Sequence, residues 1–118
     1  MKREEPVRQW FMALLKERCR VPDSVIRAET GFKLGDKLYR AAILVWDRNA
    51  RPLAVVECKA PEVPLTTAVL DQAVRYNMVL GVRWIFLTNG NSVIALHKVD
   101  NNFVPVEELP DYERMLSE

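Results

Sequence analysis

The stretch Leu53-Ala54-Val55-Val56-Glu57-Cys58-Lys59 decides how the rest of this sequence is interpreted. An apolar run leads into a carboxylate and an ammonium group two positions apart. Alternate side chains of a β-strand point to the same face, so Glu57 and Lys59 share a face with Leu53 and Val55. Charges at the end of an apolar strand cost free energy unless the strand reaches solvent there or a site uses them. Both interpretations stay open from these residues alone.

A helix is predicted after this strand. Residues 60–64 end the strand, Thr66 or Thr67 can cap the helix, and Gly81 is a natural stop after about Leu80. Gln72 and Tyr76 are four positions apart and therefore lie on one helix face. The inner face is predicted to consist of Leu70, Ala73, Val74, Asn77 and Met78.

The remaining elements complete one α/β domain over residues 1–118. A helix is predicted over residues 4–19, strands over 24–34, 40–46, 84–88 and 92–99, and a loose final helix over 107–115. Asn89-Gly90 is a strong hairpin turn. The run Ala41 to Trp46 is apolar on both faces, which predicts a covered position inside the sheet. The order α-β-β-β-α-β-β predicts a mixed sheet of about five strands flanked by helices.

Composition excludes several classes of protein. The net charge is +1, yet residues 1–40 hold ten basic side chains against six acidic ones, an excess that could face phosphates or belong to a solvated helix face. Two cysteines and one histidine do not suggest a disulfide framework or a zinc site. The longest apolar run has six residues, far short of the ~20 that span a bilayer. We therefore expect a reduced cytoplasmic protein with no membrane association and no apolar signal segment.

Two motifs together resemble a known group of enzymes. One motif is similar to an E-x-K strand and consists of Val55-Val56-Glu57-Cys58-Lys59-Ala60-Pro61. The other is similar to a Q-x-x-x-Y helix and consists of Gln72 with Tyr76. A weaker similarity to the strand and turn that come next is found at Leu87 to Gly90. The pattern resembles the PD-(D/E)XK nuclease superfamily and, more narrowly, the N-terminal nuclease domain of type I restriction enzyme R subunits. The resemblance implies a restriction-endonuclease-like core and hydrolysis of DNA phosphodiesters with Mg²⁺ or Mn²⁺. It also implies DNA as a partner, together with a second copy of the chain or other chains of a restriction system.

The resemblance assigns roles to individual residues. Glu57 is expected to hold the metal ion, and Lys59 is expected to activate or orient the attacking water. Gln72 and Tyr76 complete the predicted catalytic set by contacting the nucleic acid or supporting the lysine. Glu29 is the candidate for a further metal ligand, although it lies on a predicted strand and matches the family pattern poorly.

One position departs from the pattern. In Arg40-Ala41-Ala42-Ile43-Leu44-Val45, Ala42 stands where the family carries Asp, and a methyl group cannot bind a metal. The site is then degenerate, altered by substitution, or rebuilt around Glu29 or Asp47, of which Asp47 faces the opposite way along a regular strand. Two functions follow: a metal-dependent nuclease domain, or a catalytically inactive nucleic-acid-binding or assembly module that keeps the nuclease fold.

Overall fold

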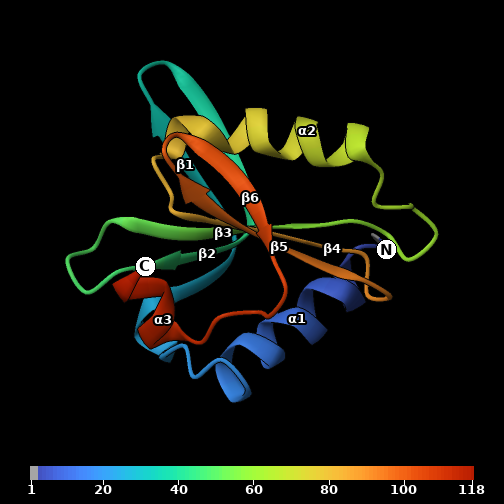
Figure 1. The fold of residues 1–118 in the computed structure, drawn as a ribbon, viewed down its shortest axis with the longest axis horizontal. Helices are drawn as coiled ribbons and strands as arrows, with labels where there is room; N and C mark the ends of the chain where they lie inside the picture. Colours follow the sequence, from blue (N-terminus) through green and yellow to red (C-terminus); the bar gives the residue numbers. More distant parts are fainter. Residues whose placement is uncertain (1–2) are drawn as a thin grey trace.

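A single six-stranded sheet organises the chain (Figure 1). The computed structural model describes residues 3–118, without the side chains of Phe32 and Leu34. The strands lie side by side in chain order: β1 (Ile26–Leu34), β2 (Lys37–Trp46), β3 (Pro52–Cys58), β4 (Trp84–Thr88), β5 (Val93–Val99) and β6 (Asn102–Val106). The helices are α1 (Glu5–Glu17), α2 (Thr67–Asn77) and α3 (Tyr112–Ser117), with short 3₁₀ turns at Asp23–Val25 and Met78–Leu80.

The sheet is mixed because one connection is a crossover. Strands β3 and β4 pair in parallel, and every other neighbouring pair is antiparallel. Parallel strands need a long connection, and α2 supplies it. Figure 1 shows α2 on one side of the sheet and α1 with α3 on the other. The predicted α/β architecture, with a mixed sheet flanked by helices, is confirmed.

Each face of the sheet has its own core. On the α1 and α3 side, Phe11 and Leu15 pack with Tyr112, Met115 and the strand residues around Val56. On the α2 side, Leu70 and Val74 pack with a smaller cluster that includes Leu44, Val55 and Ile85. Strand β2 is flanked by β1 and β3, as its two-sided apolarity predicts.

The helix after β3 begins as predicted and ends differently. The Thr66 hydroxyl caps α2 by accepting a hydrogen bond from the Val69 amide at 3.3 Å, and Gly81 stops the segment in the left-handed conformation at φ 68°. The prediction that Met78 belongs to the inner face is wrong, because its side chain is 52% exposed. The chain tightens into a 3₁₀ turn after Asn77, which changes the angular spacing of the side chains.

Strand β6 was not anticipated from the sequence. Asp100 and Asn101 form the two-residue turn before it with φ values of 49° and 68°, the conformation of a tight hairpin. Pro105 cannot donate a hydrogen bond to a ladder, but β6 is an edge strand, where proline is tolerated.

Other boundaries also shift. The second strand starts at Lys37 rather than Arg40, and the last helix covers Tyr112–Ser117 rather than 107–115. Trp84 is fully buried, whereas Trp10 is 44% exposed. Within residues 3–118, no helix has the length and apolar character needed to cross a bilayer.

The two cysteines predict how stability depends on pH. Burial raises the pKa of Cys19 to about 11 and that of Cys58 to about 12, from an ordinary value of 9.0. Above pH 9 the unfolded state therefore binds fewer protons than the folded state, so the free energy of unfolding falls as pH rises from about 9 to about 12. The slope is at most ~1.4 kcal/mol per pH unit for each thiol.

Urea unfolding at a series of pH values measures this slope. The double variant Cys19→Ala, Cys58→Ala should be less stable at neutral pH because small cavities form, but its stability should fall less steeply above pH 9. Equal slopes for the parent and the double variant would contradict the assignment.

Candidate functional site

The end of β3 and one face of α2 enclose a small cleft of about 180 Å³. It is lined by Arg40, Glu57, Lys59, Val69, Gln72, Ala73 and Tyr76. The expectation that Glu57 and Lys59 share one concavity with Gln72 is confirmed, and Tyr76 lies there too. Strand alternation directs Glu57 and Lys59 to the α2 side, and the four-residue spacing of the helix directs Gln72 and Tyr76 back toward them.

Glu57 and Lys59 form a loose ion pair. The Lys59 Nζ lies 3.8 Å from Glu57 Oε1, and the two side chains are 33% and 30% exposed. Partly exposed pairs of this kind add little to stability. Both groups remain accessible from the cleft, so the ammonium can meet an anionic ligand while the carboxylate holds it in position.

Tyr76 joins α2 to β2. Its hydroxyl accepts a hydrogen bond from the Arg40 amide at 3.0 Å, and its ring meets that of Tyr39 edge-on with centroids 5.5 Å apart. The hydroxyl that the family resemblance assigns to the nucleic acid or to the lysine thus accepts a bond from the backbone of β2, while its own hydrogen can still be donated to another group. In this structure Tyr76 forms one wall of the cleft and fixes its width.

The turn between β4 and β5 holds the loop that follows β3. The Lys59 amide donates to the Thr88 carbonyl at 2.8 Å, and the Asn89 side-chain amide donates to the Val63 carbonyl at 2.7 Å. The Asn89 side-chain oxygen also accepts from the Asn91 and Ser92 amides, both at 2.9 Å. Sequence reasoning treated Asn89 only as part of a turn. Asn89 also holds the loop after β3, and the sign of this second role is that its side chain is buried. The sequence alone does not reveal that burial.

Glu29 and Ala42 belong to a different cavity. A space of about 100 Å³ on the α1 side is lined by Glu4, Glu5, Arg8, Glu29, Ala42 and Cys58. Glu29 adopts a positive φ of 47°, and its carboxylate lies 3.8 Å from Arg8 Nε. Arg8 also pairs with Glu5. The structure therefore does not bring Glu29 into the cleft of Glu57, and a guanidinium group already lies beside it.

The described residues do not form a ready metal site. Among residues 3–118, no three His, Cys, Asp or Glu side chains are grouped so that they could share an ion. The cleft contributes only the Glu57 carboxylate, with the Lys59 ammonium beside it. Cys58 is on the opposite side, where burial raises its pKa and keeps the thiol protonated. Asp47, five residues after Ala42, instead accepts hydrogen bonds from the Asn49 and Arg51 amides in the β2–β3 turn. The residues present therefore do not fit Mg²⁺ coordination by two carboxylates.

Comparison with known proteins identifies the family. The sequence model of the type I restriction enzyme R protein N terminus (HSDR_N) matches residues 3–110. The chain belongs to this family. The predicted relation to type I R subunits is confirmed at this level.

A solved structure supports the same fold. A fragment described as an HsdR subunit of a type I restriction enzyme from Vibrio vulnificus YJ016 superposes with a TM-score of 0.72 at 22% identity. The match covers 98% of this chain and 25% of that one, so this chain spans about a quarter of the length of the matched protein. The comparison with curated proteins gives no significant match.

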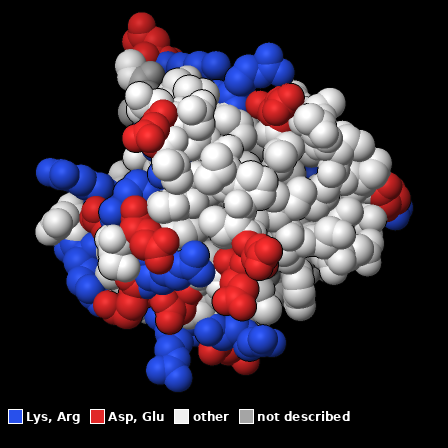
Figure 2. Space-filling view, in the orientation of Figure 1, with Lys and Arg blue, Asp and Glu red and all other residues white. Residues whose placement is uncertain are grey.

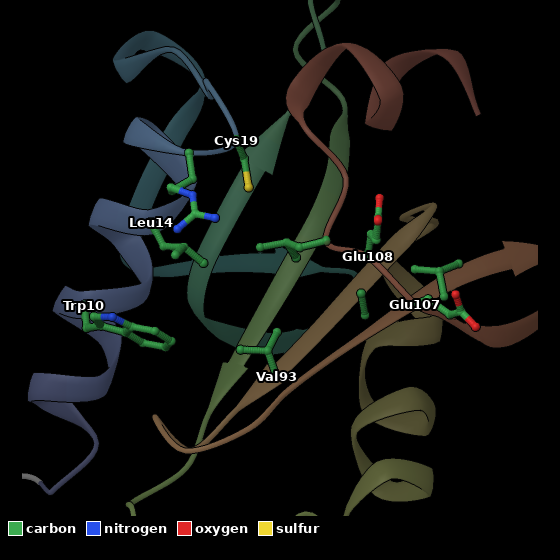
Figure 3. A pocket seen from close by; sticks show the side chains of 10 residues that line it. Trp10, Leu14, Cys19, Val93, Glu107 and Glu108 are labelled. Atoms are coloured by element: carbon green, nitrogen blue, oxygen red, sulfur yellow. The ribbon is translucent and has the colours of Figure 1, made fainter.

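A larger cavity than this cleft lies elsewhere in the chain. A groove of about 590 Å³ lies on the α1 side, away from Glu57 and Lys59. Figure 3 shows Trp10 and Leu14 extending from α1 toward Val93, with Glu107 and Glu108 on the other side. Its lining contains no residue of the E-x-K or Q-x-x-x-Y motifs, so size alone does not identify the functional site.

The hydrogen bonds of Asn89 predict a specific loss of stability. Asn89→Ala removes three hydrogen bonds at a buried position and should lower the free energy of unfolding by about 1–3 kcal/mol. Asn91→Ala is the matched control, because its exposed side chain makes one bond to the Pro61 carbonyl at 3.1 Å. Urea denaturation measures both. A loss at Asn91 as large as that at Asn89 would contradict the proposed clamp.

Proposed function

We propose that this domain binds the phosphate backbone of DNA in the cleft between β3 and α2 and hydrolyses it poorly or not at all. The observation that carries the proposal is the composition of the cleft: Arg40, Lys59 and Gln72 surround a single carboxylate, Glu57. DNA is the substrate class that the resemblance to PD-(D/E)XK nucleases implies, and membership of a restriction-enzyme family is in keeping with it.

The donors of the cleft suit a phosphodiester. An ammonium group and a side-chain amide are common partners of phosphate oxygens in protein–DNA complexes. Lys59 would donate to a phosphate oxygen, with Glu57 orienting its ammonium group from 3.8 Å away. Gln72 would donate from the helix side. Tyr76 keeps the two walls at a fixed separation through its bond to the Arg40 amide.

Hydrolysis requires more than this cleft offers. Metal-assisted cleavage uses bound cations to generate the nucleophile and to stabilise the leaving oxygen. Ala42 presents a methyl group at the position where the family pattern has Asp, and the Glu29 carboxylate lies beside Arg8. One carboxylate next to a lysine leaves a cation weakly held, which supports binding over catalysis.

Substitution of Glu57 distinguishes direct phosphate binding from metal-dependent cleavage. If the cleft binds phosphate directly, Glu57→Gln removes a repelling charge and should tighten duplex binding about fivefold without metal, since one charge pair near 4 Å in water contributes ~1 kcal/mol. If Glu57 is a metal ligand of an active nuclease, the same substitution should instead abolish Mg²⁺- or Mn²⁺-dependent cleavage by the parent.

Fluorescence anisotropy with a labelled duplex and a plasmid-nicking assay measure the two outcomes. Glu108→Gln is the control, because it removes the same charge from an exposed position that lines the other groove. Robust metal-dependent nicking by the parent would overturn the proposal in favour of a nuclease. Absence of any DNA binding would favour an assembly module.

Position 42 provides an independent test. Ala42→Asp adds a carboxylate to the cavity that already contains Glu29, and should strengthen Mn²⁺ binding measured by calorimetry. Without metal the new charge should lower stability, and metal should restore it. Ala42→Asn has the same shape without the charge and should not gain affinity. Equal Mn²⁺ affinity in the parent and both variants would show that a carboxylate at position 42 does not complete a metal site in this cavity.

A further inference from the structure

The tip of the β1–β2 hairpin continues beyond the region where β2 pairs with β3. We infer that residues 31–40, called the arm below, form a second contact to DNA by entering a groove of the duplex whose backbone the cleft binds. The inference rests on the proposed function and extends it: it names duplex DNA as the form bound and assigns contacts to Lys33 and Lys37.

The arm extends beyond the sheet. Strands β1 and β2 remain paired from Gly31↔Arg40 to Leu34↔Lys37, whereas the β2–β3 pairing stops at Ile43↔Val56. Figure 1 shows the hairpin rising past the sheet beside the end of α2. Four residue pairs at ~3.3 Å per residue give a ribbon about 13 Å long. A two-stranded ribbon of this kind fits the major groove of B-DNA, which is about 12 Å wide.

The charge of the arm suits a polyanion. It contains Lys33, Lys37 and Arg40 against Asp36, an excess of two positive charges in a chain whose net charge is +1. All four residues are exposed. Figure 2 shows Lys and Arg side chains along the edge where the hairpin and α2 lie, together with acidic side chains at the tip and beside the helix.

The side chains of Lys33 and Lys37 lie on opposite faces of the ribbon. Lys33 pairs with Leu38 and Lys37 with Leu34, and adjacent pairs of a ladder point to opposite faces. Lys37 is on the α2 side, with its Nζ 5.0 Å from the centroid of the Tyr39 ring. A ribbon inside a groove has a phosphate backbone on each side, so cations on both faces can each reach one backbone.

The arm is also joined to the cleft. Tyr39 is the one buried side chain among those described in residues 31–40, and it packs against Tyr76. The Arg40 amide at the base of the arm donates to the Tyr76 hydroxyl, and Arg40 lines the cleft. An exposed two-stranded ribbon is only marginally stable in water. Tyr76 therefore fixes the arm at the mouth of the site, where one duplex can meet both.

Anisotropy titrations with a labelled duplex test the arm. Lys33→Ala, Lys37→Ala in the full chain should weaken binding about tenfold at low salt and reduce the slope of log K against log[NaCl] by about 1.8, the value for two phosphate contacts. The charge-conserving double variant Lys33→Arg, Lys37→Arg should bind like the parent. A control double variant, Arg20→Ala, Arg51→Ala, removes equal charge from exposed positions in the turns after α1 and after β2 and should change affinity little.

The outcomes separate the two proposals. If the parent binds no duplex, the proposed function fails and the role of the arm fails with it. If the parent binds but the arm variant matches the control double variant, only the arm is overturned. If the arm variant loses affinity for a single strand as strongly as for a duplex, insertion into a groove is overturned. Unchanged thermal unfolding of the variants shows that a loss of affinity does not come from misfolding.

Discussion

Side-chain alternation along β3 divides this domain into two chemically different halves. The strand is covered on both faces, so successive side chains pack against different helices. Val55 packs toward α2, and Val56 packs toward α1 and α3. The same alternation continues where the strand leaves the core. Glu57 then lines the cleft under α2, and Cys58 lines the cavity beside Arg8. A polar side chain at the end of β3 cannot be moved to the other face of the sheet unless the core residues of the strand change faces as well.

The distribution of charge follows from this division. On the α1 side, Arg8 has only 14% of its side chain exposed and lies between Glu5 and Glu29. The cation beside these carboxylates is therefore the guanidinium group of Arg8. On the α2 side, the Lys59 ammonium balances the Glu57 carboxylate, and Arg40 adds a further cation. The α1-side cavity has Glu4, Glu5 and Glu29 beside Arg8, and the α2-side cleft has Glu57 alone. Among residues 3–118, no three acidic, His or Cys side chains converge so that they could share a divalent cation. A cleft of this composition suits an anionic ligand.

Hydrogen bonds from distant parts of the chain set the shape of the cleft. The β4–β5 turn holds the loop after Lys59 through Thr88 and Asn89, and Tyr76 holds the base of the β1–β2 hairpin through the Arg40 amide. Both attachments bind backbone groups, so they constrain the path of the chain and do not engage the Glu57, Lys59 and Gln72 side chains. The walls of the site are therefore fixed by the fold, as pre-organised binding sites require.

The sequence by itself determined the α/β class, the interior position of β2, the capped start of α2, and the shared face of Glu57 with Lys59 and of Gln72 with Tyr76. These features depend on periodicity and on local backbone chemistry, which act within a few residues. Only the tertiary structure decided that Glu29 lies beside Arg8 rather than Glu57, that the Tyr76 hydroxyl binds the β2 backbone, and that Asn89 clamps a loop 26 residues away. It also decided that β6 pairs at the edge despite Pro105. Each depends on which strands become neighbours, and that is set by the packing of both cores together, for which no short stretch of sequence carries a signal.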